Sequence, residues 1–243
     1  MQKIISYPLS FIVLMLILLA LVIFHPIQWI CLNVFGYQAH KKSVDYLNFI
    51  LLRIVHLLGT TFVFEGRESI PKGVPIIFVA NHQSLYDIIA MIWFLRRFHP
   101  KFVSKKELGS GVPSVSFNLK HGGSVLIDRK DPKQAIPSIK KLSEYIEKNN
   151  RSAVIFPEGT RSKNGKPKEF AQSGVKILCK YAPSAYVVPI KVMQFLESKV
   201  DGFVDQYLIP VEEIWQPSDF LPNSESDNFL EEVKELREIS KDL

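Results

Sequence analysis

The sequence predicts an α/β domain with a largely parallel sheet flanked by helices, preceded by an N-terminal membrane-associated helical segment. Two observations support this fold class. Apolar residues crowd into about the first sixty positions, which indicates contact with a membrane. From Thr60 onward, short apolar stretches alternate with helical patterns, which is typical of parallel strands joined by helices. We therefore expect membrane-binding helices over residues 1–59 and an α/β domain over residues 60–243.

Composition narrows the classes of function. The net charge of +6 suits a protein that works at an anionic surface or on phosphate-bearing substrates. Nucleic acid would also fit this charge, but the aromatic residues lie within apolar runs and no DNA- or RNA-binding motif is present. The two cysteines, Cys31 and Cys179, make no disulfide framework and fit a reducing compartment.

The first element is an uncharged stretch from Ile4 to Phe24, preceded by Lys3 and ended by His25-Pro26. About twenty helical residues reach roughly 30 Å, so this helix can cross a bilayer or lie in one leaflet. A signal peptide is the alternative, but no small-x-small cleavage site follows, so we expect the segment to be retained. Trp29 and Tyr37 come next, and such rings favour the lipid headgroup level.

A second helix is predicted from Val44 to Leu58. Its apolar face holds Leu47, Ile50, Leu51, Ile54, Leu57 and Leu58, and its polar face holds Asp45, Asn48, Arg53 and His56. This pattern predicts a helix lying in the membrane interface; the alternative is an ordinary helix that faces the core of a soluble domain. Lys41, Lys42 and the basic domain beyond them favour a location on the cytoplasmic face of the inner or plasma membrane.

Six strands and further helices are expected in the α/β domain. The strands are Thr61–Phe64, Pro75–Val79, Lys101–Ser104, Ser124–Ile127, Ala153–Phe156 and Tyr186–Val192. A helix from Asp131 to Lys148 would begin with Asp131 as its N-cap and Pro132 at its first position, with Pro137 bending it or delaying its start. The acidic stretch from Ser224 to Leu243 predicts a C-terminal amphipathic helix.

The stretch Asn81–Asp87 places a histidine and a carboxylate between a buried strand and a helix. Ser84 to Asp87 has the form of a capping box, so the helix would start at Ser84 and leave His82 in the loop. A histidine held by a carboxylate acts as a general base, because the acid fixes the tautomer and stabilises the imidazolium. The alternative is that Asp87 merely caps the helix.

Two further strand ends carry charged residues, Gly123–Arg129 and Phe156–Ser162. Gly159 permits close approach of the backbone to a ligand, and Arg161 offers a fork of donors suited to phosphate. Ligands of open α/β sheets bind beyond the carboxyl ends of strands, where all three motifs lie. The alternative is that the arginines are surface charges paired with acidic neighbours. A P-loop, a Gly-x-Ser-x-Gly elbow and metal-ligand spacing around His82 are absent from the sequence.

Together these motifs resemble the 1-acyl-sn-glycerol-3-phosphate (lysophosphatidic acid) acyltransferases, the glycerolipid acyltransferases with an N-H-x-x-x-x-D box. The blocks of that family match Asn81–Asp87, Gly123–Arg129, Phe156–Ser162 and Val188–Ile190, in order, over roughly residues 60–195. Lys105–Leu108 matches the family's Lys-x-x-Leu stretch, whereas Leu126 stands where Phe is common and Lys191 where an apolar residue is usual.

The resemblance implies transfer of an acyl group from acyl-CoA or acyl carrier protein to the sn-2 hydroxyl of 1-acyl-sn-glycerol 3-phosphate, giving phosphatidic acid. His82 would be the general base and Asp87 would hold its ring, with no metal and no cofactor besides the acyl donor. The implied phosphate-binding residues are Lys105, Arg129, Glu158, Gly159, Thr160 and Arg161. The implied partners are a phospholipid membrane, lysophosphatidic acid and the acyl donor, with no nucleic acid.

Two alternatives remain open from the sequence. An acyltransferase of the same superfamily could use glycerol 3-phosphate or another lysophospholipid as acceptor. A membrane phospholipid-binding protein without catalytic activity belongs to a different class, and release of free thiol from an acyl thioester would separate it from an enzyme.

Overall fold

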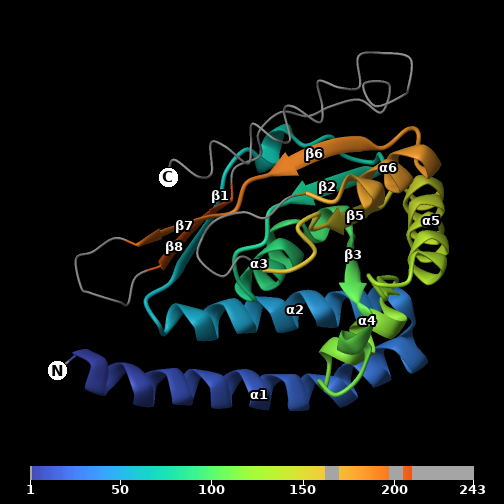
Figure 1. The fold of residues 1–243 in the computed structure, drawn as a ribbon. Helices are drawn as coiled ribbons and strands as arrows, with labels where there is room; N and C mark the ends of the chain where they lie inside the picture. The colour runs from blue at the N-terminus through green and yellow to red at the C-terminus, as the bar shows by residue number, and fades with distance from the viewer. Residues whose placement is uncertain (1, 162–169, 197–204, 210–243) are drawn as a thin grey trace.

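The computed structural model describes residues 2–161, 170–196 and 205–209. Within them a five-stranded, wholly parallel sheet has the strand order β4-β3-β5-β2-β6 (Figure 1). Its strands are β2 (Ile76–Ala80), β3 (Pro100–Lys105), β4 (Val125–Ile127), β5 (Ser152–Ile155) and β6 (Tyr186–Ile190). The predicted α/β fold with a parallel sheet is therefore confirmed. The C-terminal helix predicted from Ser224 lies outside the described residues.

Helices cover both faces of this sheet. The helices are α1 (Gln2–Phe35), α2 (Tyr37–His56), α3 (Tyr86–Phe94), α4 (Val115–His121), α5 (Pro132–Asn149) and α6 (Gln172–Tyr181), with short 3-10 turns at Arg67–Ser69, Arg96–Phe98 and Lys106–Gly109. On one face, Met91 of α3 packs in a cluster with Phe78 of β2. On the other face, Leu142 of α5 and Leu178 of α6 pack against Ile77. Since both faces are covered, β2 is buried throughout, which explains its unbroken apolar run.

The strand β1 (Thr61–Phe64) belongs to a separate small sheet, so its predicted place in the main sheet is wrong. It pairs in parallel with β8 (Asp205–Ile209), which pairs antiparallel with β7 (Met193–Leu196). No strand was predicted over β7 or β8, so the true partner of β1 was missing from the pattern.

The helix α5 begins where it was predicted to begin. The carboxylate of Asp131 accepts hydrogen bonds from the backbone N–H of Lys133 at 3.0 Å and of Gln134 at 3.4 Å, as an N-cap does. Pro137 lies inside the helix and does not delay its start.

The helix α1 is longer than predicted, because it runs through Pro26 to Phe35. The predicted end at His25-Pro26 is therefore wrong: the ring removes one backbone hydrogen bond, but the helix continues until Gly36, whose φ of 79° suits a residue without a side chain. Over Tyr7–Phe35 it is the one helix among the described residues that is long and apolar enough to cross a membrane.

The helix α2 lies between α1 and the α/β domain (Figure 1). Leu47 and Leu51 of α2 pack against Ala20 and Leu21 of α1, and Asn48 is buried although the pattern placed it on the polar face. The face of α2 that was predicted to lie in the membrane interface therefore packs against α1 at Leu47 and Leu51, as the alternative of a helix that faces the core requires.

Exposed apolar side chains are concentrated on α1 instead. They are Tyr7, Phe11, Ile12, Leu14, Met15, Leu18, Leu19, Val22, Ile23, Ile27, Trp29, Ile30, Val34 and Phe35. The other side of α1 is fastened to the domain: the Ser114 hydroxyl donates to the Leu21 carbonyl at 2.7 Å, and the Ser114 N–H donates to Nδ1 of His25 at 3.1 Å. The free face of α1 is thus a continuous apolar surface that water solvates poorly.

Candidate active site

The loop after β2 is tied to the loop after β6 by the side chain of Asn81. Its amide donates to the Val192 carbonyl at 2.9 Å, and its oxygen accepts the Val192 N–H at 2.6 Å. Asn81 is buried, so these bonds also satisfy both ends of an amide that water cannot reach. The first residue of the motif therefore fixes where the chain leaves β2.

His82 lies in the loop and contacts Asp87. Its Nδ1 is 2.8 Å from Oδ2 of Asp87, whose carboxylate is completely buried. The same Oδ2 accepts the backbone N–H groups of Gln83 and Ser84, each at 2.8 Å. The predicted contact between His82 and Asp87 is confirmed, and one oxygen serves both the helix start and the histidine ring.

The predicted capping box forms only in part. Asp87 bonds back to the Ser84 N–H as the motif requires, but the Ser84 hydroxyl accepts from the N–H of Tyr86 at 3.3 Å. The helix α3 accordingly begins at Tyr86 with Leu85 as its N-cap, slightly later than predicted.

The ring of His82 is held from a second side by an aromatic residue. It stacks on Phe156, which follows β5, with a centroid distance of 4.2 Å and an interplanar angle of 23°. The His82 side chain is 12% exposed, so one edge of the ring remains accessible. Because the carboxylate engages Nδ1 as a hydrogen-bond donor, Nε2 is left with a lone pair that can accept a proton.

Glu158 holds the backbone of the same loop. Its Oε1 accepts the His82 N–H at 2.7 Å, and the residue is buried. This contact gives Glu158 a task other than the phosphate binding implied by the resemblance, because an ionised carboxylate accepts hydrogen bonds and repels phosphate. The third block thus orients the histidine of the first.

The cationic residues gather at the same edge of the sheet. Lys105 ends β3 and is paired in register with Ile127, so Arg129 follows two residues beyond that pair. Gly159 has a φ of 72°, and a Cβ built on it would lie 3.7 Å from Nη1 of Arg129, so the second and third blocks meet. Arg161 and Thr160 are exposed beyond β5.

Comparison with known proteins identifies the family of the chain. The family model described as acyltransferase matches residues 61–193, more than half of the chain. The chain belongs to the acyltransferase family. A model for a fatty acid desaturase also matches residues 189–243, most of which lie outside the described residues.

Curated relatives of this acyltransferase match about half of the chain. The 1-acyl-sn-glycerol-3-phosphate acyltransferase of Helicobacter pylori is 38% identical over 136 residues, which cover 53% of this chain and 54% of the relative. The chloroplastic relative LPAT1 of Arabidopsis thaliana is 33% identical over 130 residues, covering 53% of this chain and 35% of the relative. The chain therefore matches about half or less of the length of these relatives.

A solved structure shares the fold. The crystal structure of the 1-acyl-sn-glycerophosphate acyltransferase PlsC from Thermotoga maritima superposes with a TM-score of 0.77 at 23% identity, covering 100% of this acyltransferase and 97% of that chain. At this identity the likeness establishes the fold, including the parallel sheet and the long N-terminal helix.

Proposed function

We propose that this acyltransferase transfers a fatty acyl group from acyl-CoA or acyl carrier protein to the sn-2 hydroxyl of 1-acyl-sn-glycerol 3-phosphate. The product is phosphatidic acid. The observation that carries the proposal is the bond of 2.8 Å between His82 and buried Asp87, at the sheet edge that also holds Arg129 and Lys105. The relatives that are 1-acyl-sn-glycerol-3-phosphate acyltransferases support the choice of acceptor.

The chemistry is direct attack on the thioester. Nε2 of His82 takes the proton of the acceptor hydroxyl while its oxygen bonds to the thioester carbonyl carbon, giving a tetrahedral intermediate. That intermediate collapses, its carbon–sulfur bond breaks, and the imidazolium returns the proton to the leaving thiolate. Asp87 stabilises the imidazolium between these steps, and the stack on Phe156 holds the plane of the ring.

The acceptor phosphate is matched by positive charge. Lys105, Arg129 and Arg161 supply cationic donors at the carboxyl ends of the strands, and the backbone at Gly159 has no side chain to obstruct it. Glu158 acts by positioning His82 rather than by touching the phosphate.

The acyl chain of the acceptor is expected to stay in the membrane while its hydroxyl reacts. We infer that α1 lies along one leaflet with its free apolar face in the acyl region, on the cytoplasmic side where the basic residues Lys41 and Lys42 lie. A perpendicular crossing conflicts with the bonds from Ser114 to Leu21 and His25, because these would draw the polar domain into the hydrocarbon.

An assay of purified protein tests the proposed reaction. With palmitoyl-CoA as donor, we expect thiol release with lysophosphatidic acid to exceed that with an unphosphorylated acceptor by about tenfold to a hundredfold, since losing a charged contact to phosphate costs about 1.5–3 kcal/mol. It should also exceed that with glycerol 3-phosphate, because that acceptor keeps the phosphate but has no acyl chain to hold in the membrane. A faster reaction with glycerol 3-phosphate would instead support the alternative, an acyltransferase of the same superfamily that uses glycerol 3-phosphate as its acceptor. If no acceptor causes thiol release with either donor, the protein is not an enzyme of this kind, and the alternative of a phospholipid-binding protein without catalytic activity is supported.

Replacing Arg161 with alanine is expected to raise the KM for the acceptor about tenfold to a hundredfold, with a much smaller effect on the KM for the acyl donor. The reason is that a charge-assisted bond to phosphate contributes about 1.5–3 kcal/mol. Steady-state kinetics with each substrate varied in turn measures this, and Lys176→Ala on the exposed side of α6 is the control. Equal increases for both substrates would assign Arg161 a structural role.

Replacing Glu158 with alanine is expected to lower kcat by about ten- to a hundredfold while leaving the KM for the acceptor within a few-fold. The His82 N–H would lose its buried acceptor, at a cost of about 1–3 kcal/mol, and the loop would shift. Glu158→Gln keeps an oxygen that can accept this bond and should recover most of kcat. A large rise in acceptor KM with unchanged kcat would instead place Glu158 at the phosphate.

A further inference from the structure

A polar pocket lies away from the proposed active site, where α1 turns into α2. We call it the corner pocket. It is lined by residues of α2, the start of β3 and the turn after α4, including Tyr37, His40, Lys41, Asp45, His99 and Lys101. Its volume is about 30 Å³, which is room for about two water molecules. Lys101 lies at the start of β3, whereas the residues around His82 lie at the ends of the strands.

Buried polar atoms around this pocket have no hydrogen-bond partner within the described residues. They are both ring nitrogens of His40, which is 1% exposed, Nδ1 of His99 and, behind the lining residues, Nε of Arg151, whose charge acts on both His99 and Lys101. Buried donors and acceptors are almost always paired, because each unpaired one costs free energy. These atoms indicate an occupant that the chain itself does not supply.

The charge of the pocket is positive. Lys41 forms an ion pair with Asp45 at 2.5 Å, but Lys101 is 6% exposed and its nearest aromatic contact is the ring of Tyr37 at 5.0 Å. Burial lowers the pKa of Lys101 to about 8, with Arg151 and Lys41 acting in the same direction, so its ammonium is mostly protonated at neutral pH. Lys41 and Lys101 therefore line the pocket against the single carboxylate of Asp45, and Arg151 lies close enough to act on Lys101.

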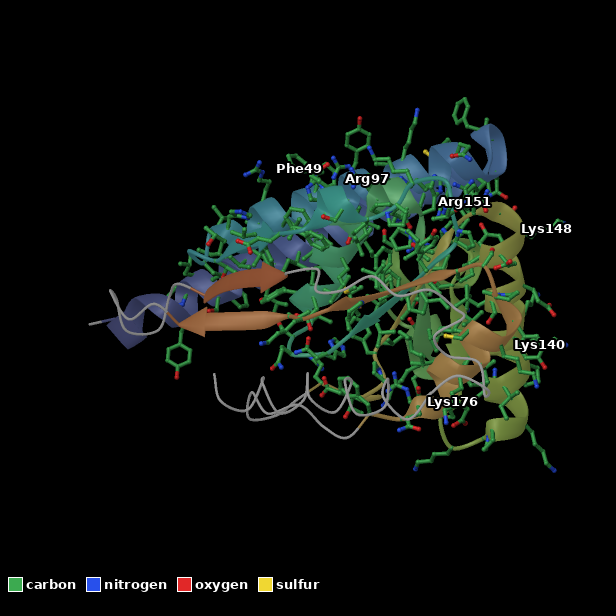
Figure 2. The ribbon with its side chains drawn as sticks, turned by 90° about the horizontal axis from the view of Figure 1, so that it is seen from above. Phe49, Arg97, Lys140, Lys148, Arg151 and Lys176 are labelled. Carbon is green, nitrogen blue, oxygen red and sulfur yellow. The ribbon has the colours of Figure 1, made fainter. Side chains whose placement is uncertain are left out.

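The two histidines act as neutral groups here. Burial, then the neighbouring positive charge, lowers the pKa of both His40 and His99 to about 4. Each neutral imidazole retains one N–H that can donate to an anion. Figure 2 places Arg151 beside the end of α5 on the side of the α1–α2 turn, with Lys176 well away on α6.

We propose that the corner pocket binds a phosphate group. Two of its oxygens replace the two waters for which the pocket has room and accept from Lys101 and the imidazoles, while its negative charge offsets Lys101 and Arg151. Tyr37, which lines the pocket, follows exposed Phe35 by two residues, so the pocket lies just beyond the end of the apolar face of α1, where phospholipid headgroups come within reach when α1 is embedded. The phosphate can therefore come from a membrane lipid or from free phosphate.

Thermal unfolding of the full chain in a non-ionic detergent tests this proposal. At about ten times the dissociation constant, inorganic phosphate is expected to raise Tm by about 3–6 °C over chloride of equal ionic strength. Lys101→Met and Arg151→Met should each lose this shift, and Lys176→Met should keep it. Two variants from different elements are used because either one alone could alter folding.

Further measurements distinguish a lipid headgroup from free phosphate, and the corner pocket from the proposed acceptor site. A phospholipid added in place of phosphate, compared with a phosphate-free lipid of equal chain length, shows whether a headgroup occupies the pocket; a shift with either source supports the proposal. Arg161→Ala should keep the shift, because it removes only the proposed acceptor site. Three results would overturn the proposal: the unmodified protein shows no shift in Tm with either phosphate source, both Lys101→Met and Arg151→Met retain the shift, or Arg161→Ala loses it.

Discussion

Replacing His82 with alanine is expected to lower kcat by about two to four orders of magnitude, the span typical of losing a general base. Loss of the stack on Phe156 and of the bond to buried Asp87 lowers the free energy of unfolding, but the bonds of Asn81 and Glu158 that hold the loop remain, so the variant should still fold. Asp87→Asn should approach the same loss, because a neutral amide no longer stabilises the imidazolium that forms on His82. Initial rates of thiol release at saturating acceptor and donor measure both effects.

The matched control is His121→Ala, which removes an exposed histidine at the end of α4 and should leave kcat unchanged. Removal of the His82 ring leaves space against Phe156, so added imidazole should restore part of the activity of His82→Ala. Restoration that follows the neutral form of imidazole would identify proton transfer as the lost step. If the activity of His82→Ala lies within a few-fold of that of the unmodified protein, His82 is not the general base.

The parts of the site that sequence predicts are those coded by neighbouring residues. The apolar run of β2, the loop with His82 and the helix start near Asp87 follow one another within a dozen residues, so the spacing indicates that the ring can meet the carboxylate. The bond between His82 and Asp87 decides between this contact and a carboxylate that only caps the helix. The N-cap of α5 is equally local, since Asp131 bonds to the backbone two and three residues later. In both places the sequence pattern predicts the contact because the residues that make it lie only a few positions apart in the chain.

The parts that sequence misses depend on contacts between distant segments. Glu158 reaches the His82 N–H across 76 positions, and Asn81 reaches Val192 across 111. No local pattern distinguishes a carboxylate that binds a backbone N–H from one that faces a ligand. The same limit explains α2: an apolar face is required both by a membrane and by a second helix, and only the packing of Leu47 against α1 decides between them.

Substituting the free face of α1 is expected to separate catalysis from access to lipid. Leu18 and Val22 are 45% and 56% exposed, and they lie four residues apart on one face of the helix. Removing two such side chains from the acyl region costs about 1.5–3 kcal/mol each, before any cost of burying the new charge. The double variant Leu18→Asp/Val22→Asp should therefore bind vesicles at least about a hundredfold more weakly and lose activity on vesicle-borne lysophosphatidic acid in proportion.

With a short-chain acceptor dissolved as a monomer, the same variant should retain activity within a few-fold, because His82 and Asp87 are untouched. The control is Ile50→Asp on α2, which is 36% exposed and belonged to the face first assigned to the membrane. If α1 alone forms the membrane surface, Ile50→Asp leaves vesicle activity near that of the unmodified protein. If it loses as much activity as the α1 variant on vesicles alone, α2 also contacts lipid. Loss on both kinds of acceptor for the α1 variant would mean that this face of α1 supports the fold, since a residue needed only for docking cannot affect a substrate that needs no membrane.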